Sequence, residues 1–127
     1  MVVIACSLAI FSVAEMKKPK SRRSPKVRLL ETLATMEWVD FRTQLDLQIR
    51  DTLYPGAIEV NYSNFEATYT IPRHVPNALP LLASSDYTYL LKNATKSKDP
   101  TVKIIIIETR MQSQAVRNVI IAISDAV

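Results

Sequence analysis

The chain opens with an almost unbroken run of apolar residues. Residues 2–11 are rich in Val, Ile and Phe, as expected of a strand in the middle of a sheet. A shorter stretch at residues 27–33 predicts a second strand, which would form a hairpin with the first. The segment between the two strands contains Pro19 and Pro25 and is predicted to be a loop.

A helical periodicity follows. Five large apolar residues recur at spacings of three or four: Trp38, Phe41, Leu45, Ile49 and Leu53. This spacing predicts one apolar stripe on an amphipathic helix of about five turns. Thr35 is the predicted N-cap. Tyr54-Pro55-Gly56 ends the helix, because proline cannot continue it and glycine permits a reversal of the chain.

The next segment alternates apolar and polar residues. Residues 58–62 and 65–71 both show a period of two, and Ser63-Asn64 separates them. This pattern predicts a β-hairpin with one buried face and one solvated face. Three prolines within residues 72–82 predict an irregular connection after the hairpin.

A short helix and a strand are predicted next. Ser84 or Ser85 can cap a helix over residues 86–94, with Asp86 in its first turn. Residues 101–108 form the most hydrophobic strand of the chain, which is expected in the centre of the sheet.

The final residues predict a second amphipathic helix at about 112–127. Its apolar face carries Val116, Val119, Ile120 and Ile123. This face can pack on the chain's own sheet, or it can form a dimer seam with a partner helix. The sequence leaves both uses open.

These elements together predict an α+β fold, organised as a single domain over residues 1–127. We expect a mixed sheet of about five strands with one long helix on one face, a short helix and an added C-terminal helix. Two hairpins flank the long helix, and the last strand returns beside the first. This order is typical of the ubiquitin-like β-grasp arrangement.

Three stretches within residues 27–108 carry a closer resemblance. They are EWVDFRTQLDLQI in the long helix, IEVNYSNFEATYTI in the second hairpin, and SSDYTYLLKNA with KDPTVKIIIIE in the short helix and last strand. This segment resembles a PB1-type domain of the β-grasp superfamily. PB1 domains pair front to back, through an acidic cluster that meets a lysine on the partner's first strand. Here residues 64–90 hold only Glu66 and Asp86 as acids, and the first strand has no lysine. The resemblance therefore implies the fold without that pairing.

Few residues can carry catalytic or metal chemistry. Cys6, His74 and Gly56 are each the single residue of their type in the sequence. These counts exclude an internal disulfide framework, a multi-thiolate metal site and a glycine-rich phosphate loop. We therefore expect a protein that is not an enzyme and needs no cofactor.

The basic residues are concentrated in one segment. Seven of the sixteen lie within twelve positions: Lys17, Lys18, Lys20, Arg22, Arg23, Lys26 and Arg28. The other nine face twelve acidic residues, so the basicity is local to a predicted loop at residues 16–26. The segment can be a solvated loop, a nuclear-localisation-like cluster, or an arm that contacts phosphates weakly and with steep salt dependence. No aromatic residue is interleaved with these charges, which argues against base stacking.

The first fourteen residues admit another interpretation. The apolar run ends in Ser12-Val13-Ala14, which resembles a signal-peptidase site, but no basic residue precedes the run. It is also too short to span a bilayer. Two sequons, at Asn61 and Asn93, would suit a secreted protein. The buried strand is the favoured interpretation, and no membrane span is predicted.

The leading functional hypothesis is a non-enzymatic protein–protein interaction module. Its partner would be another protein or a second copy of the chain, and we expect an intracellular location, cytoplasmic or nuclear. The alternative is a nucleic-acid-associated or nuclear protein that uses residues 17–28. A second alternative is a small secreted protein with a cleaved N-terminal signal.

Overall fold

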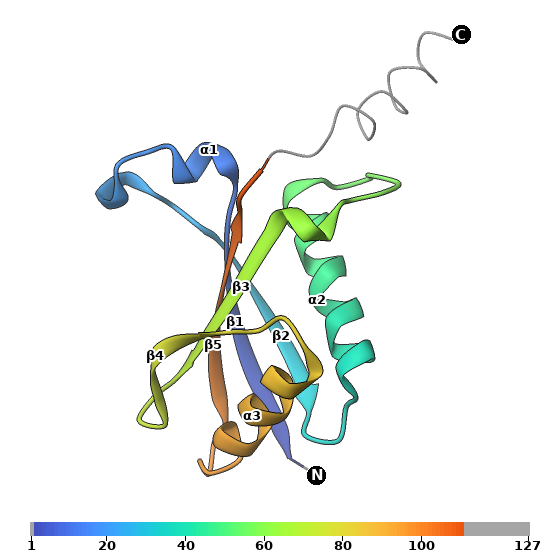
Figure 1. Ribbon diagram of the computed structural model, residues 1–127, viewed down its shortest axis with the longest axis vertical. Helices are drawn as coiled ribbons and strands as arrows, with labels where there is room; N and C mark the ends of the chain where they lie inside the picture. The colour runs from blue at the N-terminus through green and yellow to red at the C-terminus, as the bar shows by residue number, and fades with distance from the viewer. Residues whose placement is uncertain (1, 111–127) are drawn as a thin grey trace, which may run out of the picture.

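The computed structural model describes residues 2–110, which form an α+β fold built on a five-stranded mixed sheet (Figure 1). The strands are β1 (Val3–Phe11), β2 (Lys26–Leu33), β3 (Phe65–Ile71), β4 (Val75–Pro80) and β5 (Thr101–Glu108). The helices are α1 (Val13–Met16), α2 (Trp38–Leu53) and α3 (Ser84–Ala94), and the two 3-10 turns are η1 (Lys20–Arg22) and η2 (Tyr62–Asn64). The strand order across the sheet is β2-β1-β5-β3-β4.

β1 lies inside the sheet, between β2 and β5. It runs antiparallel to β2 and parallel to β5, and β3 pairs antiparallel with both β5 and β4. Three predictions are therefore confirmed: the N-terminal apolar run is a strand, it forms a hairpin with the strand that follows, and the last strand returns to the sheet beside the first.

One face of the sheet forms the hydrophobic core. The even-numbered residues of β1 from Ile4 to Ile10 are at most 1% exposed. α2 contributes Phe41, Leu45 and Ile49 to the same cluster, and α3 contributes Tyr87. The apolar stripe predicted on the long helix is thus confirmed, and α2 runs alongside the sheet (Figure 1). The other face of β1 and β2 carries exposed residues, Val3 and Leu29 among them.

The long helix begins later than predicted. Its N-cap is Glu37 and not Thr35. After β2 the chain turns, and the Met36 N–H donates to the Leu33 carbonyl (2.9 Å). The hydroxyl of Tyr87 holds this turn from α3 by donating to the Met36 carbonyl (2.8 Å). Thr35 lies within the turn, so it cannot cap the helix.

The short helix begins at Ser84, and its N-cap is Ala83 in place of the predicted serines. The Asp86 carboxylate accepts hydrogen bonds from the backbone N–H groups of Leu82 (2.9 Å) and Ala83 (3.0 Å). A negative charge in the first turn also interacts favourably with the helix dipole. An acidic side chain thus replaces the serine hydroxyl at this helix end.

The second hairpin is not the one predicted. Residues 58–62 form no strand; the Asn61 side chain accepts a hydrogen bond from the Ser63 N–H (3.1 Å) and starts the turn η2. β3 pairs instead with β4, through a turn in which Arg73 has a φ of 71°. The three prolines within residues 72–82 predicted an irregular connection, but residues 75–80 form the strand β4. Proline is compatible with a strand at the edge of a sheet.

The predicted loop at residues 16–26 is also more structured than expected. α1 follows β1 directly, with Ser12 as its N-cap, and η1 lies in the same connection. Lys26 and Arg28 belong to β2 itself. The helix predicted at about 112–127, with its face of Val116, Val119, Ile120 and Ile123, lies outside the described residues.

Candidate functional site

β2 is an edge strand whose alternate residues turn their backbone groups away from the sheet. Beyond its last residue, the Ala34 N–H donates to the Val2 carbonyl (3.0 Å), whereas the Ala5 N–H donates to the Pro100 carbonyl on the β5 side (3.0 Å). Even-numbered residues of β1 therefore bond to even-numbered residues of β2, because bonding alternates along an antiparallel pair. The N–H and C=O groups of the intervening residues face outward: Val27, Leu29 and Glu31.

The side chains of these outward residues lie on the face of the sheet opposite the core. Val27 is 63% exposed and Leu29 is 77% exposed. Two large apolar side chains therefore stand in solvent beside unpaired strand groups. We call this site the β2 edge, defined by Val27, Leu29 and Glu31.

β4, at the other edge, is built differently. It has six residues, of which Pro76 and Pro80 lack a backbone N–H. Its pairing with β3 is also irregular, since the register shifts between Tyr69 and Ile71. Proline and irregularity are two of the means by which proteins prevent strand addition at a sheet edge.

Two of the predicted basic contact residues are held at the end of α2. The Lys26 ammonium donates to the Thr52 carbonyl (3.4 Å), and the Arg28 Nε donates to the Thr52 hydroxyl (3.1 Å). The carbonyl end of a helix carries partial negative charge. Lys26 and Arg28 thus fasten β2 to α2, a role that was not predicted from the sequence.

Two more basic residues fold the connection between β1 and β2. Arg23 donates to the carbonyls of Lys18 (3.0 Å) and Met16 (3.1 Å). The Glu15 carboxylate accepts from the Lys18 ammonium (2.6 Å) and from the Ser24 N–H (2.9 Å). These bonds, the Lys18 bond first, lower the pKa of Glu15.

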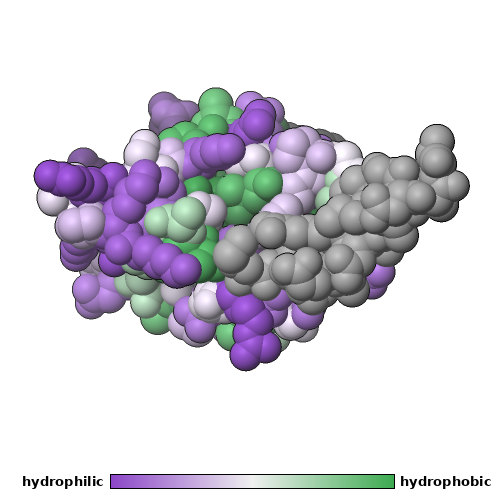
Figure 2. Space-filling model, turned by 90° about the horizontal axis from the view of Figure 1, so that it is seen from above, coloured by the Kyte–Doolittle hydropathy of each residue, from purple (hydrophilic) through white to green (hydrophobic). Residues whose placement is uncertain are grey.

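The remaining three basic residues, Lys17, Lys20 and Arg22, are exposed and make no side-chain hydrogen bond or ion pair with any residue in the described range 2–110. Figure 2 looks down on the end of the molecule that carries α1 and η1, and hydrophilic surface gathers on the side where this connection projects in Figure 1. The structure therefore divides the seven predicted residues into four with intramolecular partners and three without.

A buried carboxylate, that of Glu108, anchors the start of the connection between β1 and β2. Glu108, at the end of β5, is 3% exposed. Its Oε1 accepts from the Val13 N–H at the start of α1 (3.0 Å), and the Tyr54 hydroxyl donates to its Oε2. The sequence alone does not reveal the role of Glu108, because its partners Val13 and Tyr54 lie far away along the chain.

The single cysteine and the single histidine lie in different parts of the sheet, Cys6 within β1 and His74 between β3 and β4. Burial raises the pKa of the Cys6 thiol to about 12, so the thiol remains protonated at neutral pH and is a poor nucleophile. His74 lies in the turn between β3 and β4. Within residues 2–110 no three His, Cys, Asp or Glu side chains come together as a metal site.

One of the two sequon asparagines is buried in the structure. Asn93 is 4% exposed, and its amide donates to the Tyr89 carbonyl in α3 (2.9 Å). In the folded chain this side chain is therefore part of the packing of α3 and does not face solvent. None of the helices described between residues 2 and 110 is long and apolar enough to cross a membrane.

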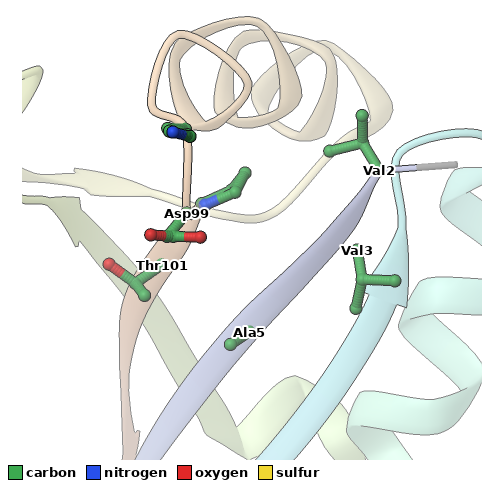
Figure 3. Close-up of a pocket in the computed structure, with 7 residues that line it drawn as sticks. Val2, Val3, Ala5, Asp99 and Thr101 are labelled. Carbon is green, nitrogen blue, oxygen red and sulfur yellow. The ribbon is translucent and has the colours of Figure 1, made fainter.

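A shallow pocket of about 390 Å³ lies where β1 and β5 begin. Its lining residues are Val2, Val3, Ala5, Lys98, Asp99, Pro100 and Thr101. Figure 3 shows the Asp99 carboxylate and the Thr101 hydroxyl close together beside β5, with Val2 and Val3 across from them. The charged groups, Lys98 and Asp99, come from one wall only.

Comparison with known proteins adds no family. No protein-family description matches the sequence, and no curated protein is significantly similar to it.

Proposed function

We propose that this chain is a non-enzymatic protein–protein interaction module whose partner adds a strand to the β2 edge. The observation that carries the proposal is the difference between the two edges of the sheet. β4 is protected by two prolines, whereas β2 has none and leaves the groups of Val27, Leu29 and Glu31 unpaired by a neighbouring strand. Strand addition is a common mode of peptide recognition, in which main-chain hydrogen bonds supply affinity.

We also propose a ubiquitin-like β-grasp arrangement for the fold. The strand order β2-β1-β5-β3-β4 supports it, as does the parallel pair of first and last strands beside one long helix. We likewise propose a relationship to PB1-type domains, supported by the same strand order and the same parallel pair of strands. The front-to-back pairing of those domains is not part of it, because Glu66 and Asp86 are the only acids in residues 64–90 and Asp86 caps α3.

The chemistry of the partner follows from the surroundings of the edge. Its strand would place apolar side chains beside Val27 and Leu29 on the open face. The exposed cations Lys17, Lys20 and Arg22 lie in the connection that leads into β2, so acidic residues flanking the partner strand would gain favourable long-range electrostatics. The predicted partner is an extended apolar segment with an acidic flank.

A selection experiment tests this proposal. The probe is a library of random ten-residue peptides, selected on the full chain and then titrated against variants. Leu29→Pro removes an outward N–H without touching a β1 bond, and it should weaken the selected peptides at least tenfold. Leu29→Thr keeps the N–H and a strand-forming side chain, so its affinity should change less than about threefold. Failure to select any peptide, or equal affinity for Leu29→Pro, contradicts strand addition.

A second candidate function rests on the three unpartnered cations. A nucleic acid could contact Lys17, Lys20 and Arg22 through its phosphates, with affinity that falls steeply as salt rises. The test compares Lys17→Gln/Lys20→Gln/Arg22→Gln with a control of equal charge change, Lys92→Gln/Lys98→Gln/Lys103→Gln. Loss of DNA and RNA binding in the first variant alone supports this function. An equal loss of DNA and RNA binding in both triple variants would mean that the binding depends on overall charge and not on Lys17, Lys20 and Arg22.

A further inference from the structure

The serine that precedes β2 stands in a sequence context that occurs once in the chain. Ser24 is followed by Pro25, and no other serine or threonine of the sequence precedes a proline. Arg22 and Arg23 come directly before Ser24, and Lys26 follows the proline. Ser24 is thus flanked by cations on both sides and by a residue of fixed φ on its C-terminal side.

The Ser24 side chain is exposed, and its hydroxyl makes no hydrogen bond with any residue between positions 2 and 110. The backbone before it is extended, because Arg23 has a φ of −72° and a ψ of 131°. A residue that precedes proline is biased towards the same extended region. Ser24 lies between η1 and β2, in the connection that projects from the sheet beside α1 (Figure 1). Another protein can therefore reach the hydroxyl without opening the core.

Ser21, three residues earlier, provides a comparison within the same basic segment. It is also exposed, but it lies inside η1 and is followed by Arg22 in place of a proline. The Arg22 N–H donates to the Pro19 carbonyl (2.8 Å), which closes the turn around Ser21. The two serines thus differ in backbone conformation and in the residue that follows them.

A phosphate on Ser24 would enter a cluster of opposite charges. The Ser24 N–H donates to the Glu15 carboxylate (2.9 Å), which also accepts from the Lys18 ammonium (2.6 Å). Arg23, the preceding residue, donates to the Lys18 carbonyl in the same connection (3.0 Å). Phosphate oxygens accept strong, charge-assisted hydrogen bonds from lysine and arginine. The fold therefore supplies cations beside the acceptor, as well as the one carboxylate that would repel the phosphate.

We propose that Ser24 is a phosphorylation site, modified by a proline-directed protein kinase that uses ATP. The substrate groove of such a kinase receives Pro25 after the acceptor and needs no hydrogen bond from the N–H that proline lacks. In the transfer, a bond forms between the Ser24 Oγ and the γ-phosphorus, while the bond from that phosphorus to the bridging β,γ-oxygen breaks. ADP leaves, and the hydroxyl proton passes to the catalytic carboxylate of the kinase.

The modification changes the charge of the connection that leads into β2. Residues 12–25 contain five Lys or Arg residues and one Glu, a formal charge of +4. Phosphoserine carries about −1.5 to −2 at pH 7, so it roughly halves this charge. The consequence rests on the proposed function: a partner strand with an acidic flank loses part of its electrostatic attraction when Ser24 is phosphorylated. The backbone groups of the β2 edge are unchanged.

Phosphate incorporation into the full chain tests the site. The chain is incubated with labelled ATP and a cyclin-dependent kinase as the proline-directed probe, and mass spectrometry locates the phosphate. Ser24 should be labelled, and Ser24→Ala should abolish the labelling. Pro25→Ala should slow labelling roughly tenfold or more, because the kinase groove selects the residue after the acceptor. Ser21→Ala, the matched control, should leave the rate unchanged.

Three results overturn the assignment of the site. They are no phosphate on Ser24 in the folded chain, equal labelling of Ser24→Ala, and an unchanged rate in Pro25→Ala. None of these results depends on strand addition, because no peptide is present in the labelling reaction.

Peptide titration tests the effect of the phosphate on the partner. The phosphorylated chain should bind a selected peptide with an acidic flank about three- to tenfold more weakly at low salt, and the difference should shrink as added salt screens the charges. The same peptide with a neutral flank should bind both forms equally. Equal affinity of both forms for the acidic-flanked peptide overturns this regulatory role. Failure to select any peptide contradicts strand addition itself, and the labelling of Ser24 is then judged by its own three results.

Discussion

The two edges of the sheet are built on opposite principles. β4 is short, carries Pro76 and Pro80, and pairs irregularly with β3. β2 is longer, contains no proline, and pairs with β1 in continuous register. A strand that lacks donors and regular spacing resists the addition of another strand, whereas β2 retains both. Among the strands described between residues 2 and 110, β2 is therefore the edge at which we propose that a partner strand adds.

The basic residues of β2 sharpen that contrast. Lysine on an edge strand often protects it from strand addition. Lys26 and Arg28, however, bond to Thr52 at the end of α2 on the core side of the sheet. Their charges are therefore directed towards the helix and do not shield the outward groups of Val27, Leu29 and Glu31.

The largest expected effect on stability is a difference between two neighbouring positions of β2, one bonded to β1 and one facing outward. Leu30 is 7% exposed, and its N–H is directed to Cys6 of β1. Leu30→Pro should therefore lower the free energy of unfolding by about 3 kcal/mol or more. Leu29→Pro, one residue away, should cost about 1 kcal/mol, because no sheet bond is lost. Urea denaturation measures both, and equal losses would contradict the assigned alternation.

The next effect concerns the connection that leads into β2. Glu108→Ala leaves the Val13 N–H without its buried acceptor and also removes the hydrogen bond that the Tyr54 hydroxyl donates to Glu108. An unsatisfied buried polar group costs about 1–3 kcal/mol, so the free energy of unfolding should fall by that amount. Glu66→Ala, an exposed carboxylate on β3, is the matched control and should change stability by less than about 0.5 kcal/mol. Similar losses of unfolding free energy in both variants would contradict a stabilising role for the Glu108 hydrogen bonds.

A smaller effect is expected at Arg28. Arg28→Gln removes the hydrogen bond to the Thr52 hydroxyl and a charge near the carbonyl end of α2. The loss should be about 0.5–1 kcal/mol in urea denaturation. Lys103→Gln removes an equal charge from the open face of β5 and should cost less. A larger loss in the control would show that general charge, and not the fastening of β2 to α2, is being measured.

The smallest effect on stability tests the closed edge. Pro76→Val with Pro80→Thr restores two N–H groups to β4, and the free energy of unfolding should change by less than about 1 kcal/mol. The protection against strand addition should nevertheless fall, so self-association should rise with concentration in sedimentation. A variant that stays monomeric at all concentrations would show that the prolines are not what closes β4.

The sequence predicted the elements whose patterns are local. The stripe from Trp38 to Leu53 identified α2, and continuous apolar runs identified β1 and β5. The hairpin of β3 was assigned to the wrong partner, because residues 58–62 alternate as a strand does although Asn61 turns the backbone there. The prolines of β4 were interpreted as interruptions of regular structure. Proline does interrupt a central strand, but an edge strand such as β4 tolerates it.

The candidate site depended on contacts that the sequence could not reveal. The bond from Arg28 to Thr52 joins residues 24 positions apart, and the bond from Val13 to Glu108 joins residues 95 positions apart. The basic segment 17–28 therefore contains residues with different roles: some, such as Arg28, bond within the fold, and others, such as Lys20, are exposed. Which strand lies at the edge, and which of its residues face outward, follows only from the pairing of the whole sheet.

Amide hydrogen exchange along β2 in the full chain tests the central claim most directly. With no peptide present, the N–H groups of Val27, Leu29 and Glu31 should exchange rapidly, while those of Arg28, Leu30 and Thr32 are protected. Addition of a selected peptide should slow exchange at the first three positions. Protection at all six positions before peptide is added, or no change at Val27, Leu29 and Glu31 after it binds, would contradict a partner strand at this edge.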